Sequence, residues 1–226
     1  MRIENKLHYY SEDKDDKKNK GMQEILLSLR KTQPGSHLIV VYPSLQVLRE
    51  IYANYIMEQL NDNEIVLLLP YYETVEDVKK VLSRFQVEKG EASIDDHIEQ
   101  GTLLIIDGHE AFFNQKQSMV EFETEDVNGS NNGRGNIVSL LRIMQAQLNR
   151  LKKDGITILV DMGCFFANGG VDYLLKYEQS IPQMFKDTSL KQLCIYHQRD
   201  FENRFTDFVQ AKLLDQHGRS VLMLDN

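Results

Sequence analysis

Several predicted strands of this chain are followed directly by polar or aromatic residues that could bind a ligand. In a parallel α/β sheet, ligands bind beyond the carboxyl ends of the strands. Hydroxyl, imidazole, carboxylate and guanidinium groups at such ends can hold a small molecule by hydrogen bonds or charge. We call this candidate set the strand-end rim, and its members are Tyr42, Ser44, Asp107, His109, Asp161, His197 and Arg199. The sequence thus predicts a binding site at the rim and no catalytic residue.

One rim residue, Asp161, ends the apolar run Ile158-Leu-Val. In phosphate-loop ATPases, an aspartate at the end of such a strand helps to hold magnesium. The turn after the first predicted strand reads Tyr42-Pro43-Ser44-Leu45-Gln46, without the glycines and lysine that bind phosphates. Pro43 also removes one backbone donor. We therefore expect no cofactor, and Mg-ATP held by an atypical loop is the alternative.

Metal and nucleophile motifs are weak in this chain. The histidines, at positions 8, 37, 97, 109, 197 and 217, show no paired His-x-x-x-His spacing. A long-range site from Cys164, Cys194 and His197 is conceivable, but two buried thiols and a hydrogen-bonded histidine are the simpler interpretation. The chain contains no Gly-x-Ser-x-Gly elbow. We therefore expect no metal site and no hydrolase chemistry.

Short apolar runs alternate with amphipathic segments along the chain, which predicts strands joined by helical crossovers. The predicted strands are His37–Tyr42, Glu64–Leu69, Thr102–Ile106, Ile156–Val160, one within Ser189–Tyr196, and Val221–Leu224. The predicted helices are Met22–Lys31, Leu45–Leu60, one from Thr74, Ile94–Glu99, Ile137–Leu151, Val171–Gln179 and Phe201–Leu213, with a loop at Gly163–Gly170. The fold class is α/β, with three layers and a mostly parallel sheet between helices. The last strand could be antiparallel at an edge.

The length of 226 residues fits one domain. Residues 1–20 are dominated by charge and predict a mobile arm, which leaves 21–226 as a single domain. Within it, residues 114–136 combine acidic residues with a glycine- and asparagine-rich stretch, which predicts a flexible insertion.

Composition limits the partners of this chain. The net charge of −8 disfavours direct nucleic-acid binding, which depends on cations that contact phosphates. No apolar run reaches membrane-spanning length, and the polar N-terminus lacks a secretory hydrophobic region. We therefore expect a cytoplasmic protein that contacts neither a membrane nor nucleic acid. A homo-oligomer is compatible with the sequence.

Three stretches in order resemble one family. They are Gly35-Ser-His37-Leu-Ile-Val-Val-Tyr42, Leu174-Leu-Lys-Tyr177-Glu178, and Leu193-Cys194-Ile-Tyr196-His-Gln-Arg-Asp-Phe201. Together they are similar to the MEDS domain, the methanogen/methylotroph sensory domain found in a dichloromethane-responsive regulator. The similarity covers roughly Gly35 to Leu224. It implies a degenerate RecA/KaiC-like core without a phosphate loop, and a sensory role.

These observations support three functional hypotheses. The first is a non-enzymatic sensory or regulatory domain that recognises a small-molecule effector or a signalling protein. The alternatives are a nucleotide-binding ATPase relative that uses Asp161, and a structural protein-interaction module. The charged arm and the acidic insertion depart from the family pattern. The resemblance also implies that any output passes through a separate partner or an oligomer.

Overall fold

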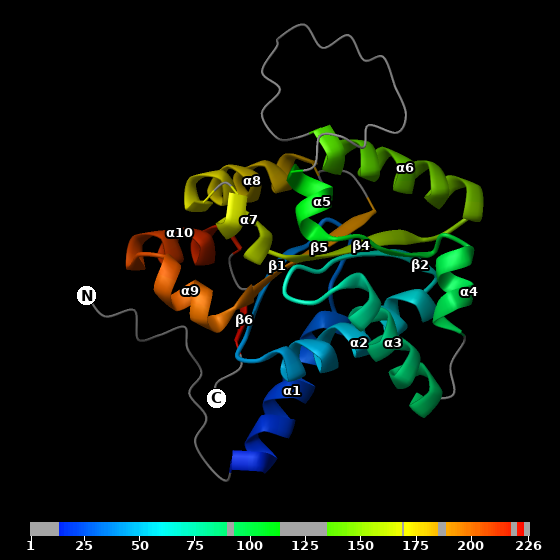
Figure 1. The fold of residues 1–226 in the computed structure, drawn as a ribbon, viewed down its shortest axis with the longest axis horizontal. Coiled ribbons are helices and arrows are strands. Elements are labelled where there is room, and N and C mark those ends of the chain that lie inside the picture. Colours follow the sequence, from blue (N-terminus) through cyan, green and yellow to red (C-terminus); the bar gives the residue numbers. More distant parts are fainter. Residues whose placement is uncertain are drawn as a thin grey trace, which may run out of the picture.

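A six-stranded sheet, with every neighbouring pair parallel, forms the centre of the fold (Figure 1). The computed structural model describes residues 14–89, 93–113, 135–168, 170–184, 189–217 and 221–223. The strands are β1 (His37–Tyr42), β2 (Glu64–Leu69), β3 (Leu103–Ile105), β4 (Gly155–Asp161), β5 (Leu190–His197) and β6 (Val221–Met223). Their order is β3-β2-β4-β5-β1-β6. All carboxyl ends therefore lie along one edge of the sheet.

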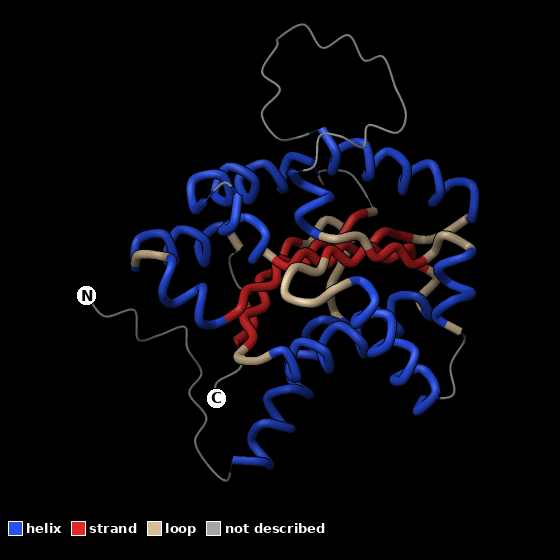
Figure 2. Tube along the Cα trace, in the orientation of Figure 1, coloured by secondary structure: helices blue, strands red, loops and turns tan. Residues whose placement is uncertain are grey.

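Helices cover both faces of the sheet (Figure 2). One face carries α1 (Lys14–Arg30), α2 (Leu45–Asn61), α3 (Val75–Lys89) and α4 (Ile94–Glu99). The other carries α5 (Gly108–Phe113), α6 (Gly135–Leu151), α7 (Gly163–Asn168), α8 (Gly170–Met184), α9 (Gln198–Arg204) and α10 (Asp207–Gln216). Every residue of β2 and β4 is buried, because parallel strands pack helices on both sides. The predicted three-layer α/β class is confirmed.

Three local predictions need correction. Helix α1 begins at Lys14 rather than Met22. Its later turns are anchored by buried residues such as Ile25 and Leu29, and adding turns to an existing helix does not incur the cost of nucleation again. The predicted loop Gly163–Gly170 contains helix α7, whose Cys164 and Phe165 are buried in the core. Strand β6 is an edge strand, as expected, and it runs parallel to β1.

The predicted insertion falls mainly on residues outside the described ranges, and so does most of the predicted charged arm. Of the arm, residues 14–20 form the first turns of α1. Both cysteines are free and buried, as predicted. Within the described ranges, no helix has the length and apolar character that crossing a bilayer requires.

The predicted last helix is two helices, broken at Phe205. Phe205 is extended (φ −105°, ψ 134°), and Thr206 caps α10 by accepting a hydrogen bond from the Val209 N–H at 3.3 Å. We expect Thr206→Ala to lower the free energy of unfolding by about 1 kcal/mol, because it removes this cap. Urea denaturation measures the change. Thr206→Ser keeps the hydroxyl and should preserve most of the stability, and an equal loss in both variants would exclude the cap as the cause.

Candidate functional site

Three rim residues meet at the centre of the sheet edge, where β4, β5 and β1 are neighbours. Asp161 ends β4, His197 ends β5 and Tyr42 ends β1. The rings of Tyr42 and His197 lie edge to face, with centroids 5.1 Å apart. Burial, together with the nearby Asp161 carboxylate, raises the pKa of Tyr42 well above its usual value. These three side chains form the polar centre of the rim.

The Asp161 carboxylate is buried and held by backbone donors. It accepts hydrogen bonds from the Gly163 N–H at 3.0 Å and the Tyr72 N–H at 3.3 Å. Burial raises the pKa of Asp161 to about 7, although the backbone N–H groups of Gly163, Tyr72 and Tyr71 act in the opposite direction. This carboxyl group therefore changes its charge near neutral pH.

A loop of residues 70–73, which follows β2, covers this carboxylate. Gly163 allows the loop to approach, because a Cβ at that position would lie 2.7 Å from ring atoms of both Tyr71 and Tyr72. The Tyr72 hydroxyl donates a hydrogen bond to the carboxylate of Asp200 on α9, and the Tyr72 ring lies 5.8 Å from that of His197. The loop is thus fastened both to the turn after β4 and to α9.

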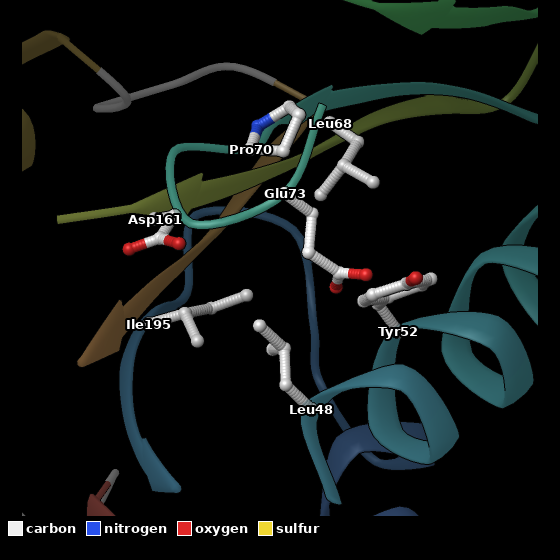
Figure 3. A pocket seen from close by; sticks show the side chains of 7 residues that line it. All are labelled: Leu48, Tyr52, Leu68, Pro70, Glu73, Asp161 and Ile195. Carbon is white, nitrogen blue, oxygen red and sulfur yellow. The ribbon is translucent and has the colours of Figure 1, made fainter. Parts of the chain in front are cut away.

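The space enclosed beneath the loop is small (Figure 3). It has a volume of about 10 Å³ and is lined by Leu48, Tyr52, Leu68, Pro70, Glu73, Asp161 and Ile195. A volume of this size holds about one water molecule. Figure 3 shows the Glu73 carboxylate pointing toward Tyr52, and Arg49 donates to the same carboxylate at 2.7 Å. A larger ligand could enter only if the 70–73 loop moved.

The Tyr42 hydroxyl is buried and has no hydrogen-bond partner within the described parts of the chain. A buried hydroxyl without a partner costs about 1–3 kcal/mol. A water molecule or a polar ligand that reached this hydroxyl would recover part of that cost.

The other four rim residues do not join this centre. Ser44 caps α2, with its hydroxyl accepting from the Val47 N–H at 3.5 Å. Asp107 and His109 lie beyond β3, at the far edge of the sheet, where Asp107 accepts from the Glu110 N–H at 3.1 Å. Arg199 is exposed on α9. The structure therefore divides the predicted rim into a central group of three residues and four residues that lie outside it.

A second polar group lies in the core, formed by His37, Glu178, Cys194 and His217. We call it the buried cluster. His37 Nε2 lies 3.1 Å from Cys194 Sγ and 3.0 Å from Glu178 Oε2. Burial raises the pKa of Glu178, but hydrogen bonds with His217 and His37 outweigh it and hold this pKa below its usual range.

No spacing rule identifies the buried cluster, because its members come from four separate elements. His37, Glu178 and Cys194 do, however, each fall within one of the three stretches that resemble the MEDS domain. Membership of those stretches was the one feature of the sequence that could have pointed to these three residues. His217 follows α10 and lies outside all three stretches, so it had no comparable signal in the sequence.

The fold is a three-layer α/β domain with a parallel sheet, and the turn after β1 lacks the glycines and lysine of a phosphate loop. The sequence model of a family described as "MEthanogen/methylotroph, DcmR Sensory domain" matches residues 36–217. This chain therefore belongs to the MEDS family, as the three stretches predicted.

Solved structures with a similar fold include the PH0321 protein from Pyrococcus horikoshii, which is in complex with an unknown peptide. The TM-score is 0.56 at 11% sequence identity, and the match covers 86% of this chain and 79% of that one. The flagellar accessory protein FlaH from Methanocaldococcus jannaschii matches with a TM-score of 0.42 at 13% identity, over 85% of this chain and 73% of that one. No curated protein matches this chain. At these identities the likeness to PH0321 concerns the fold alone.

Proposed function

We propose that this chain is a non-enzymatic sensory domain that binds a small-molecule effector at the centre of the strand-end rim. The observation that carries the proposal is the meeting of Asp161, Tyr42 and His197 under the 70–73 loop. Binding there would displace the loop, whose Tyr72 is bonded to Asp200 on α9. Occupancy would thus alter the position of a surface helix, which is the kind of change that a partner protein can detect.

The side chains around the centre favour an effector that donates hydrogen bonds or carries positive charge. Three carboxylates, of Asp161, Asp200 and Glu73, lie close enough to act on the buried Tyr42 hydroxyl. The rings of Tyr42, Tyr72 and His197 stand beside them. Carboxylates and aromatic faces both attract organic cations. A small amine or guanidine compound is therefore the ligand class that fits best.

Mg-ATP is the alternative ligand, and the same carboxylates disfavour it. Phosphate groups would find neither a lysine nor a glycine-rich turn at the first strand end, and the nearby Arg49 and Arg204 are already paired with Glu73 and Asp200. Ser44, the hydroxyl at the first turn, already caps α2. Asp161 could still help to bind the magnesium ion of Mg-ATP, so Mg-ATP is one of the ligands titrated below.

Calorimetric titration and protein NMR with tetramethylammonium, methylguanidinium and Mg-ATP test the proposal. We expect saturable shifts with at least one organic cation, localised to residues 70–73 and α9, and no binding of Mg-ATP. Asp161→Asn should weaken the cation about tenfold at about pH 8, where Asp161 is ionised, equivalent to about 1.4 kcal/mol, because one attracting charge is lost. Asp154→Asn, which removes an exposed carboxylate just before β4, at the opposite end of the sheet from the rim, is the matched control.

Two outcomes would contradict the proposal. Micromolar binding of Mg-ATP that Asp161→Ala abolishes would place the nucleotide hypothesis first. Failure of both cations to bind, with the fold intact, would exclude the proposed ligand class.

A further inference from the structure

We propose that His37, Glu178, Cys194 and His217 bind a divalent transition-metal ion, with zinc the best match. This site is separate from the strand-end rim and does not depend on the function proposed for the rim. The four residues each offer one ligand atom, and these atoms all lie within 4.8 Å of one another.

The spacing of the ligand atoms fits a single ion. The two Nε2 atoms of His37 and His217 are 3.0 Å apart, and His217 Nε2 lies 3.3 Å from Glu178 Oε2. His37 Nε2 lies 3.0 Å from the same oxygen and 3.1 Å from Cys194 Sγ. Tetrahedral zinc with bonds of about 2.0–2.3 Å would place neighbouring ligand atoms roughly 3.3–3.7 Å apart. These four separations would lengthen slightly on binding, and the other two pairs of ligand atoms, which lie within 4.8 Å, would adjust to the same range.

The direction of the lone pairs supports the same conclusion. His217 Nδ1 lies 2.7 Å from the Leu213 carbonyl oxygen, so Nδ1 carries a proton and the neutral ring presents the Nε2 lone pair to the cluster. His37 Nε2 has three close neighbours, but a single N–H can serve only one of them well. Glu178 Oε2 is buried and faces both imidazole Nε2 atoms, that of His37 at 3.0 Å and that of His217 at 3.3 Å. A cation at the centre would satisfy all of these lone pairs together.

Neighbouring residues hold the ligands in place, as in known metal sites. Tyr196 donates to Glu178 Oε1 at 2.5 Å, which leaves Oε2 directed at the cluster. Gln192 Nε2 donates to Cys194 Sγ at 3.1 Å, and the Tyr177 hydroxyl lies 3.2 Å from that same nitrogen. The Leu213 carbonyl orients His217. Three of the four ligands therefore have an orienting partner.

The charges also balance. A thiolate and a carboxylate together carry two negative charges, which a divalent ion would neutralise. The side chains of Glu178 and His217 are fully buried and that of His37 is 9% exposed, so an unbalanced charge would be costly here. Two nitrogen ligands, one sulfur and one oxygen in a closed arrangement match structural zinc better than magnesium or calcium, which prefer oxygen alone.

The ion would connect four elements that are distant in sequence. His37 begins β1, Cys194 lies within β5, Glu178 lies in α8 and His217 follows α10 (Figure 1). His37 is at the opposite end of β1 from Tyr42, so the site lies away from the rim. The sequence-based expectation of no metal site considered short spacings and the set Cys164, Cys194 and His197. Of that set, only Cys194 belongs to the cluster.

Metal analysis of the full chain, purified with a tag that contains no histidine, tests the proposal. We expect about one zinc ion per chain in the native protein. Replacing zinc by cobalt should produce a near-ultraviolet band from charge transfer between sulfur and cobalt, together with the strong visible bands of tetrahedral cobalt. Cys194→Ser should abolish the sulfur band. Cys164→Ser removes the other buried thiol and should keep it.

A second measurement covers the case in which Cys194→Ser does not fold. The wild-type chain, unfolded with chelator and refolded with or without cobalt, should recover its native circular dichroism more completely with the metal. Absence of bound metal in the native protein, combined with no cobalt spectrum after refolding, would overturn the proposal. The residues would then form a metal-free network of hydrogen bonds between Glu178 and the two histidines. A cobalt spectrum that Cys164→Ser abolishes and Cys194→Ser preserves would overturn it as well.

Discussion

Replacing Lys191 by methionine is expected to lower the free energy of unfolding by about 3–5 kcal/mol. Lys191 Nζ lies 2.5 Å from Glu64 Oε1, and both side chains are at least 90% buried. The same ammonium donates to Gln59 Oε1 at 2.5 Å, while Thr157 donates to the second carboxylate oxygen of Glu64. Without Lys191, the Glu64 carboxylate would stay buried at the amino end of β2 with no cation beside it.

Urea denaturation of three variants separates this effect from a simple loss of packing. Glu64→Gln combined with Lys191→Met removes both charges, and it should recover most of the stability that Lys191→Met loses. Lys80→Met breaks the exposed ion pair with Asp77 and should change little. If the double variant is as unstable as Lys191→Met alone, an uncompensated charge is not the cause.

The second large effect is on the pH dependence of stability, through Asp161. Its pKa is about 7 in the folded protein because the carboxyl group is buried. The unfolded value is about 3.9, so between these values the folded state binds more protons than the unfolded state. The stabilisation from Asp161 is therefore complete below about pH 4 and is lost as the pH rises through 7. The loss approaches about 1.4 kcal/mol per pH unit and totals about 4 kcal/mol.

Comparison of the wild type with Asp161→Asn isolates this contribution, since other carboxyl groups titrate in both proteins. The free energy of unfolding of the wild type minus that of the variant should decrease from about pH 4.5 to about pH 7 and level off above that, where Asp161 is ionised in both states. Asp154→Asn, which removes an exposed carboxylate, is the control. A difference that rises with pH would mean that the folded protein favours the ionised carboxylate.

Periodicity was sufficient to predict the layers of this fold, because buried parallel strands leave an unmistakable apolar run. His37–Tyr42 and Glu64–Leu69 were predicted at the bounds that the structure has. Predictions failed where a short-range signal competed with packing. Gly163 suggested a loop, but the burial of Phe165 favours a helix there. The Thr206 cap was hidden within an apolar pattern that continues across the break.

The candidate sites were only partly accessible from the sequence. The rule that ligands bind at strand ends identified Tyr42, Asp161 and His197, although the order of the strands in the sheet was not known from the sequence. It also included Asp107 and His109, because a sequence does not reveal that β3 is the far edge of the sheet. The 70–73 loop covers Asp161 because it approaches Gly163 closely. No local sequence pattern predicts that approach. The buried cluster required four elements to be placed in three dimensions.

The strand order has a consequence for synthesis on the ribosome. Both neighbours of β1, which are β5 and β6, are made after all the other strands. At about 5–20 residues per second, β1 waits roughly 8–30 seconds for its first partner to be translated. During that time an apolar strand of five buried residues offers unpaired backbone groups on both edges. Nascent chains arrested before Leu190 should therefore depend on chaperones, and released full-length chains should not.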